Sequence, residues 1–319
     1  MTHDDITRAD IAAARERIAA DVRHTPLMRI RGSQLGIDCA ELWLKLEHLQ
    51  VGGSFKARGM FNRMRLNPVL EAGVVIASGG NAGIAAAVAA KAMGVRCEVF
   101  VPETASQAKR DKLAELGAVL TIAGASYAEA LAASLERQAQ TGALLMHAYD
   151  QREVVIGAGT LAAEVEEDAG VPDRVLVSVG GGGLIAGVAS WFQDRCWIDA
   201  LEPELAPTLF RAREAGKPVD VAVSGIAADS LGARRIGSIA WGVTQRYVDA
   251  AHLVSDAAIR VAQLAMWKEL RLAVEPAAAL PLAALRAGIV KPGGDEHVLL
   301  VICGANLDLA SLAVQASGV

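Results

Sequence analysis

The chain has 319 residues, of which 53% are hydrophobic and 21% are charged, and its formal net charge is -5. This composition supplies a sizeable core and excludes a disordered chain, and the lack of a basic stripe argues against nucleic acid as the main partner. The four cysteines are far apart and predict neither a zinc knuckle nor a disulfide framework. No apolar run reaches the roughly 18 residues of a membrane span, and the polar amino terminus is unlike a signal peptide. We therefore expect a soluble cytoplasmic protein that does not contact a membrane.

Apolar strands alternate with helical patterns along most of the chain. In chain order, the spacing predicts a helix at 4–22, a strand at 41–46, a helix at 56–66, a strand at 74–77, a helix at 84–93, a strand at 97–101, a helix at 105–116, a strand at 119–122, a helix at 126–140, a strand at 175–179, a helix at 184–192 and a strand at 297–302. Such alternation indicates an α/β fold with parallel-rich sheets and helices on both faces. No repeat or linker is visible, so two closely packed domains are expected.

The strongest functional motif is a run of four glycines, 180–183, between a predicted strand and a predicted helix. Glycines let backbone N–H groups converge at a helix amino terminus, which is a geometry that binds phosphate. Two other interpretations stay open. The run Gly181-x-Gly183-x-x-Ala186 also matches a dinucleotide-binding fingerprint, with Glu202 placed where an acid would bind the ribose. A tight turn without any ligand is the other interpretation.

A second glycine turn, Ser78-Gly79-Gly80-Asn81-Ala82-Gly83, offers backbone donors, a hydroxyl and an amide. These groups suit a carboxylate, although a plain strand-to-helix connection capped by Asn81 explains them equally well.

In a third turn, glycines precede Lys56, one of eight lysines, at the start of a predicted helix. The helix dipole would lower the pKa of that amine and favour a Schiff base, whereas most lysines are solvated surface groups. A reactive lysine, a phosphate cup and a carboxylate loop are together what an enzyme needs to hold pyridoxal phosphate and an amino acid.

The sequence resembles the fold-type II pyridoxal-phosphate enzymes, in the serine/threonine dehydratase branch, along nearly its whole length. The matching segments are His24-Thr25-Pro26-Leu27, Gly53-Ser54-Phe55-Lys56-Ala57-Arg58-Gly59, Ser78-Gly79-Gly80-Asn81-Ala82-Gly83, Gly157-Ala158-Gly159-Thr160, Gly180 to Gly183, Glu275-Pro276 and Cys303-Gly304-Ala305-Asn306. Their order and spacing match the family as well. The resemblance implies a two-domain fold like that of the tryptophan synthase β subunit. Residues 1–72 and 151–319 would form a large cofactor-binding domain, and residues 73–150 a small inserted substrate domain.

The resemblance also implies roles around the cofactor ring. Lys56 would hold the cofactor as a Schiff base and then take the α-proton of the substrate. Phe55 would lie against the pyridine ring, Asn81 would bind the 3-hydroxyl, and Glu275 would lie near the ring edge. Cys303 would face the pyridine nitrogen. Because a thiol has a pKa of about 8.5, it cannot keep that nitrogen protonated, which favours β-elimination over transamination.

Further roles implied by the resemblance concern the phosphate, the substrate and a cation. The phosphate would be bound by the backbone N–H groups of Gly180, Gly181, Gly182, Gly183 and Leu184. The substrate carboxylate would be held by the loop Ser78, Gly79, Gly80, Asn81 and Ala82. Gly79 stands where racemizing relatives carry a serine, so efficient racemization is not expected. Glu202 and the Ala206 carbonyl match a segment through which some relatives bind magnesium or another divalent cation, although Thr208 replaces an acid there.

The implied activity is that of an ammonia-lyase. It would convert L-serine, L-threonine or a related β-hydroxy amino acid to a 2-oxo acid and ammonia by β-elimination, in amino-acid catabolism. The alternative within the fold is β-replacement of the cysteine-synthase type. Alternatives from other classes are a nicotinamide-linked oxidoreductase, which rests on the glycine fingerprints alone, and a non-catalytic amino-acid-binding module. The expected partner is a small-molecule amino acid, and the expected assembly is a homodimer, as is common in the family.

Overall fold

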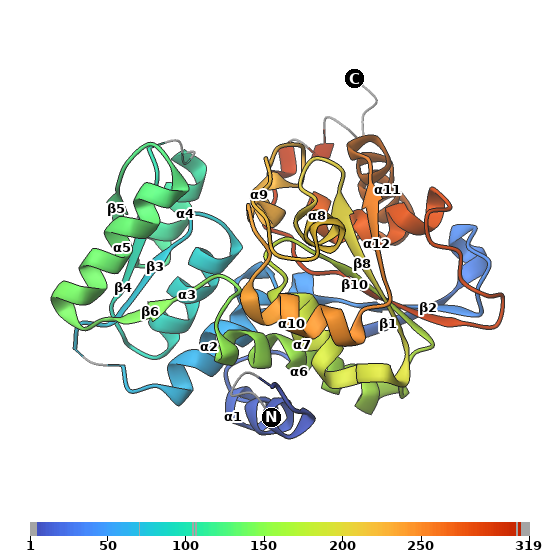
Figure 1. Cartoon of the computed structure of the whole chain (residues 1–319), viewed down its shortest axis with the longest axis horizontal. Coiled ribbons are helices and arrows are strands. Elements are labelled where there is room, and N and C mark those ends of the chain that lie inside the picture. Colours follow the sequence, from blue (N-terminus) through green and yellow to red (C-terminus); the bar gives the residue numbers. More distant parts are fainter. Residues whose placement is uncertain (1–4, 70, 104, 106, 311, 314–319) are drawn as a thin grey trace.

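The computed structural model describes residues 5–69, 71–103, 105, 107–310 and 312–313. Two sheets form the framework, and helices lie on both faces of each (Figure 1). This arrangement confirms the predicted α/β class with parallel-rich sheets. In the part of the chain that the structure describes, no helix is long and apolar enough to cross a membrane.

The larger sheet has six strands in the order β1-β2-β10-β7-β8-β9. Its strands are β1 (Leu27–Arg31), β2 (Glu41–Lys45), β7 (Arg174–Ser178), β8 (Trp197–Pro203), β9 (Ala250–Val254) and β10 (His297–Val301). All neighbouring strands run parallel except β1 and β2, which are antiparallel. The central strands are apolar on both faces, because helices cover the sheet from both sides.

Two layers of helices enclose the larger sheet. They are α1 (Arg8–Ile18), α2 (Lys56–Leu66), α6 (Arg152–Ala169), α7 (Gly183–Phe192) and α10 (Ser238–Tyr247) on one side, and α8 (Thr208–Ala215), α9 (Ala228–Leu231), α11 (Asp256–Leu270) and α12 (Pro276–Arg286) on the other. Helix α7 packs on α6 and β7, while α12 packs on β7, β8 and β10 with α11 against it. The glycine-rich start of α7 is thereby held at the edge where β7 ends.

The smaller sheet has four parallel strands in the order β5-β4-β3-β6. Its elements are β3 (Val74–Ala77), α3 (Asn81–Ala92), β4 (Cys97–Val101), α4 (Gln107–Glu115), β5 (Val119–Ile122), α5 (Tyr127–Thr141) and β6 (Leu144–Met146). Successive side chains of β3 face opposite sides: Val74 and Ile76 join the core under α3, whereas Val75 and Ala77 join the core under α5. The domain boundaries at residues 72 and 150 stay a prediction.

Two elements differ instructively from the sequence prediction. Helix α1 begins at Arg8 instead of residue 4, because Thr7 and Asp10 form a reciprocal capping box. Residue 4 itself lies outside the described residues. Helix α6 was not predicted. It contains Gly157-x-Gly159-x-x-Ala162, which formally matches the dinucleotide-binding fingerprint but here serves helix packing. A Cβ at Gly157 would come within 2.5 Å of the Arg58 carbonyl oxygen, so glycine allows α6 to approach α2 closely.

Candidate active site

Lys56 is the first residue of α2 and follows two glycines in the left-handed region, Gly52 (φ 73°) and Gly53 (φ 75°). Its Nζ donates to the Ala148 carbonyl oxygen at 2.6 Å and lies 4.8 Å from the centre of the Phe55 ring. Burial lowers the pKa of the Lys56 amine to about 8, against the opposing charges of nearby acidic groups. A neutral, nucleophilic amine is therefore accessible close to physiological pH.

A buried network of charges fixes the helix that carries Lys56. Arg58 is completely buried and donates to Glu47 at 2.7 and 2.8 Å and to Glu164 at 2.6 and 2.8 Å. The equally buried Lys45 lies 2.7 Å from the Glu164 carboxylate, and Thr25 donates to Glu47. Two buried cations thus face two buried carboxylates, and the partly exposed Asp168 lies 3.8 Å from the Lys45 Nζ. The network joins β2, α2 and α6, and nothing in the sequence had indicated it.

The four-glycine turn after β7 packs too tightly for side chains. A Cβ at Gly181 would lie 2.3 Å from the Tyr149 ring, and a Cβ at Gly182, whose φ is 88°, would lie 2.5 Å from the Ala240 Cβ. The turn leads directly into α7, whose first N–H groups have no partner within the helix. These donors, together with the positive end of the helix dipole, suit a phosphate.

One cavity brings these elements together. Its lining residues are Phe55, Lys56, Asn81, Ser178, Gly180, Gly181, Gly182, Gly183, Leu184, Ser230, Leu231, Glu275, Ala277 and Cys303. All the residues predicted to contact the cofactor are among them. Sequence reasoning missed Ser178, Ser230, Leu231 and Ala277. Ser230 carries no signal of its own in the sequence, because it lies on the short helix α9 and enters the cavity only through the tertiary fold.

Glu275 and Cys303 give the floor of the cavity its charge properties. The Asn81 Nδ2 donates to both carboxylate oxygens of Glu275, at 2.9 and 3.0 Å. Burial nevertheless raises the pKa of Glu275 to about 7, although hydrogen bonds from Asn81 and Ser230 oppose the shift. Burial also raises the pKa of the Cys303 thiol well above its ordinary value, so this group stays neutral. The resemblance implied that Cys303 faces the pyridine nitrogen of the cofactor without keeping it protonated, and a neutral thiol agrees with that expectation.

The predicted carboxylate loop lies between β3 and the first turn of α3. The Gly80 N–H donates to the Ser78 Oγ at 3.4 Å, and Ala82 is buried in α3. A Cβ at Gly79 would have only ordinary contacts, at 3.4 Å from the Val101 side chain and farther from Ala105. The loop therefore has room at Gly79 for a small side chain.

The predicted cation ligands lie elsewhere, on β8 and just before α8. The fully buried Glu202 accepts from the N–H groups of Leu209 and Phe210 at 2.8 and 2.7 Å and from Thr208 Oγ1 at 2.8 Å. The Ala206 carbonyl accepts from the Thr208 N–H at 3.2 Å. Glu202 thus caps α8, which also removes it from the ribose-binding role of a dinucleotide fold. Within the described residues, no group of three or more His, Cys, Asp and Glu side chains could hold a metal ion.

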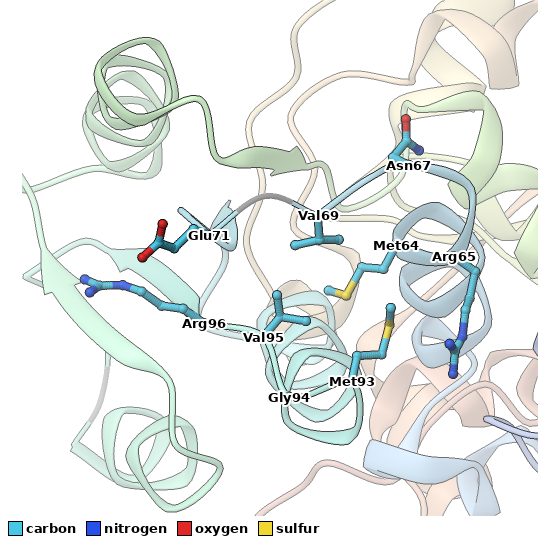
Figure 2. A pocket seen from close by; sticks show the side chains of 9 residues that line it. All are labelled: Met64, Arg65, Asn67, Val69, Glu71, Met93, Gly94, Val95 and Arg96. Atoms are coloured by element: carbon cyan, nitrogen blue, oxygen red, sulfur yellow. The ribbon is translucent and has the colours of Figure 1, made fainter.

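A larger hollow, of about 580 Å³, lies at the carboxyl end of α2 and beside the connection between α3 and β4 (Figure 2). Its lining residues are Met64, Arg65, Asn67, Val69, Glu71, Met93, Gly94, Val95 and Arg96. Met64, Val69 and Met93 belong to one apolar cluster. The Arg65 guanidinium is paired with Asp21 at 2.6 Å. None of these residues is a nucleophile, so the cavity that contains Lys56 is the candidate reactive site.

Comparison with known proteins identifies the class. Residues 18–304 match the model of the family described as pyridoxal-phosphate dependent enzyme, and the chain belongs to that family. It is 34% identical over 313 residues to an L-threonine ammonia-lyase of Geobacter sulfurreducens, covering 95% of this chain and 76% of that protein. It is 33% identical over 311 residues to a beta-hydroxyaspartate dehydratase of Paracoccus denitrificans, covering 96% and 98%. The structure of maize serine racemase matches with a TM-score of 0.91 at 30% identity over 98% of both chains.

The predicted fold class, a fold-type II pyridoxal-phosphate enzyme, is thereby confirmed. The cavity also fits the cofactor chemically. An amine that is partly neutral can bond to an aldehyde, and the amino terminus of α7 offers free N–H donors to a phosphate in a turn that has no space for side chains. The roles of the individual residues toward the cofactor and the substrate stay predictions.

Proposed function

We propose that the protein is a pyridoxal-phosphate-dependent dehydratase, or ammonia-lyase. It converts L-serine, L-threonine or a related β-hydroxy amino acid to a 2-oxo acid and ammonia. The observation that carries the proposal is the meeting of Lys56, the glycine turn 180–183 and the neutral Cys303 in one cavity. The threonine ammonia-lyase and the β-hydroxyaspartate dehydratase to which the chain is similar support the same reaction class.

Each group in the proposed mechanism has a distinct task. When bound, pyridoxal phosphate supplies the electron sink for the charge that develops at the substrate α-carbon. Lys56 Nζ takes the α-proton, because burial keeps part of its amine neutral and the Ala148 carbonyl holds its position. The N–H groups of residues 180–184 bind the phosphate, and the Ser78–Ala82 loop holds the substrate carboxylate. The neutral Cys303 would leave the pyridine nitrogen unprotonated, which favours departure of the β-hydroxyl, with a proton, as water. Hydrolysis of the released enamino acid then gives the 2-oxo acid and ammonia.

The test is release of 2-oxo acid from L-serine, D-serine, L-threonine, threo-3-hydroxyaspartate and phenylserine. We expect release from at least one L-amino acid of the panel, and the ranking identifies the preferred side chain. Lys56→Ala should abolish release, whereas Lys91→Ala, which changes an exposed lysine on α3, should leave it unchanged. No release from any compound by protein that holds the cofactor would contradict the dehydratase and favour β-replacement of the cysteine-synthase type.

The proposal also includes a small mobile domain, a homodimer and a cation site, and each has its own test. A small domain of residues 73–150 that closes on the substrate is supported by the separate four-stranded sheet, and protection from limited proteolysis by substrate tests it. A cytoplasmic homodimer is supported by composition and by what is common in the family, and sedimentation in solution tests the dimer. A cation at Glu202 and Ala206 stays a prediction without structural support. Loss of activity on chelation, restored by magnesium, would establish it, and activity that survives chelation would contradict it.

A further inference from the structure

Asn306, five residues after β10, bridges the two segments that carry Lys56 and Asn81. Its Nδ2 donates to the Asn81 Oδ1 at 2.8 Å and to the Gly52 carbonyl oxygen at 2.8 Å. The Asn306 backbone also lowers the pKa of the Glu275 carboxyl, against the larger effect of burial. One residue thus contacts the turn before Lys56, the first residue of α3 and the start of α12.

These contacts determine which end of the Asn81 amide faces the cavity. An asparagine amide has an oxygen that only accepts and a nitrogen that only donates. The Asn81 oxygen is taken by the Asn306 Nδ2, and the Asn81 nitrogen points to Glu275, which it contacts at 2.9 and 3.0 Å. Rotating the amide by half a turn would bring two N–H groups together at Asn306 and two oxygens together at Glu275. The present orientation is therefore strongly favoured.

The backbone around Asn306 is shaped for this contact. A Cβ at Gly53 would lie 2.8 Å from the Asn306 Oδ1, and a Cβ at Gly304 would lie 2.6 Å from the Glu275 Oε1. The Ala305 N–H donates to the Gly53 carbonyl at 2.9 Å. Glycine at both positions thus lets the two side chains approach, and the Cys303–Asn306 segment is tied to the Lys56 turn.

We propose that Asn306 is a positioning residue that acts through Asn81. It fixes the Asn81 amide so that its NH2 group, and not its oxygen, lies toward Glu275 and the cavity. One N–H then serves the Glu275 carboxylate, and the other is available to an acceptor such as the 3-oxygen of pyridoxal phosphate. The inference rests on the proposed function only in taking this cavity as the cofactor site. It adds that the donor property of Asn81 depends on a residue from the carboxyl-terminal segment of the chain.

A double-mutant cycle on cofactor affinity tests the proposal. The dissociation constant for pyridoxal phosphate is measured by fluorescence titration of cofactor-free full-length protein, for wild type, Asn81→Ala, Asn306→Ala and the double variant. Asn306→Ala should weaken binding about tenfold, which corresponds to about 1.4 kcal/mol, within the range for a lost buried hydrogen bond. In the Asn81→Ala background, the same change should weaken binding by less than about twofold, because the residue through which Asn306 acts is absent.

Two further variants separate positioning from mere structural support. Asn306→Asp keeps the size of the side chain but removes the donor, so it should weaken binding at least as much as Asn306→Ala and shift the visible absorption of the bound cofactor. It also serves as the test if the alanine variant does not fold. Asn67→Ala, which removes an amide-to-carbonyl hydrogen bond at the far end of α2, is the matched control and should leave the dissociation constant unchanged.

The outcomes divide cleanly. If Asn306→Ala raised the dissociation constant for pyridoxal phosphate by the same factor in the wild-type and Asn81→Ala backgrounds, the inference would be overturned. Wild-type affinity of the Asn306→Asp variant would overturn it as well. Either result would leave the proposed function intact. Wild-type protein that fails to bind pyridoxal phosphate would overturn the proposed function, and this inference with it. If the increase in the dissociation constant caused by Asn306→Ala falls below about twofold in the Asn81→Ala background, the inference is supported, even if none of the tested amino acids proves to be a substrate.

Discussion

The buried charge network under Lys56 makes a quantitative prediction for Glu164→Gln. The Glu164 carboxylate accepts from two Arg58 nitrogens at 2.6 and 2.8 Å, and Lys45 Nζ lies 2.7 Å from it. The substitution leaves two fully buried cations with one buried carboxylate, Glu47, and with the partly exposed Asp168, which lies 3.8 Å from the Lys45 Nζ. Breaking a buried pair in this way costs about 3–5 kcal/mol. At about 2–4 °C per kcal/mol, the melting temperature should fall by roughly 10 °C.

The assay is thermal unfolding followed by circular dichroism, with a control on the same helix. Glu166→Gln changes an identical side chain that is paired with Arg195 at 2.7 Å and with Arg8 at 3.1 Å but lies partly in solvent. Solvent-accessible pairs are worth about 0–1 kcal/mol each, so this variant should lose about 2 kcal/mol at most and melt clearly above Glu164→Gln.

A charge-balancing second substitution completes the test. Lys45→Met in the Glu164→Gln background removes one cation and leaves Arg58 paired with Glu47, so part of the lost stability should return. Equal melting temperatures for Glu164→Gln and Glu166→Gln, or a further loss on adding Lys45→Met, would refute the reasoning. The pKa of Glu164 is lowered in the fold, against the cost of its burial, by Arg58 and Lys45. Its contribution to stability is therefore present above the ordinary carboxyl pKa and is lost as the pH falls into the acid range.

Three other predictions follow from single residues. Because the pKa of Lys56 is lowered to about 8, the rate at which cofactor-free protein captures pyridoxal phosphate should rise with pH up to about 8 and then level off, as followed by visible absorption; a rise that continues to pH 10 would contradict this. Gly181→Ala places a Cβ 2.3 Å from the Tyr149 ring and should weaken cofactor binding about tenfold or more, whereas Gly242→Ala, which meets nothing within 4 Å, should bind normally. Gly79→Ser should yield more inverted amino acid per 2-oxo acid released, as measured by chiral chromatography, because it places a hydroxyl where wild type has none; an unchanged ratio would count against that role.

Much of the fold could be predicted because its signals are local. The strands β3, β4, β5, β7 and β10 are short apolar runs ended by glycine or proline, and the chain around each fixes them. Strand β8 escaped prediction because it carries Asp199 and Glu202. The first carboxylate is buried with Arg174 at 2.7 Å and His252 at 2.8 Å as partners, and the second caps α8. Helix α6 was missed because its glycines oppose helix formation and are explained only by the approach of α2.

The candidate site divides in the same way. Glycine turns and a lysine at a helix start can be recognised in a sequence, because their chemistry follows from residue type and spacing. The residues that hold these motifs in place cannot be recognised in the sequence. Arg58 lies in a recognisable segment, but its burial and its pairing with Glu164 follow only from the fold, and Asn306 lies 225 residues from the Asn81 side chain that it contacts. Tertiary contact alone shows that the motifs around Thr25, Lys56 and Thr160 meet in one network.

The central claim is that Lys56 is the amine to which the cofactor is bound, and peptide mapping tests it most directly. Protein purified with pyridoxal phosphate is treated with borohydride, which makes the bond between a lysine and the cofactor permanent, and the digest is examined by mass spectrometry. The account predicts a pyridoxyl group on the peptide that contains Lys56 and on none of the other seven of the eight lysines. A label on another lysine, or no label on protein that holds the cofactor, would contradict it.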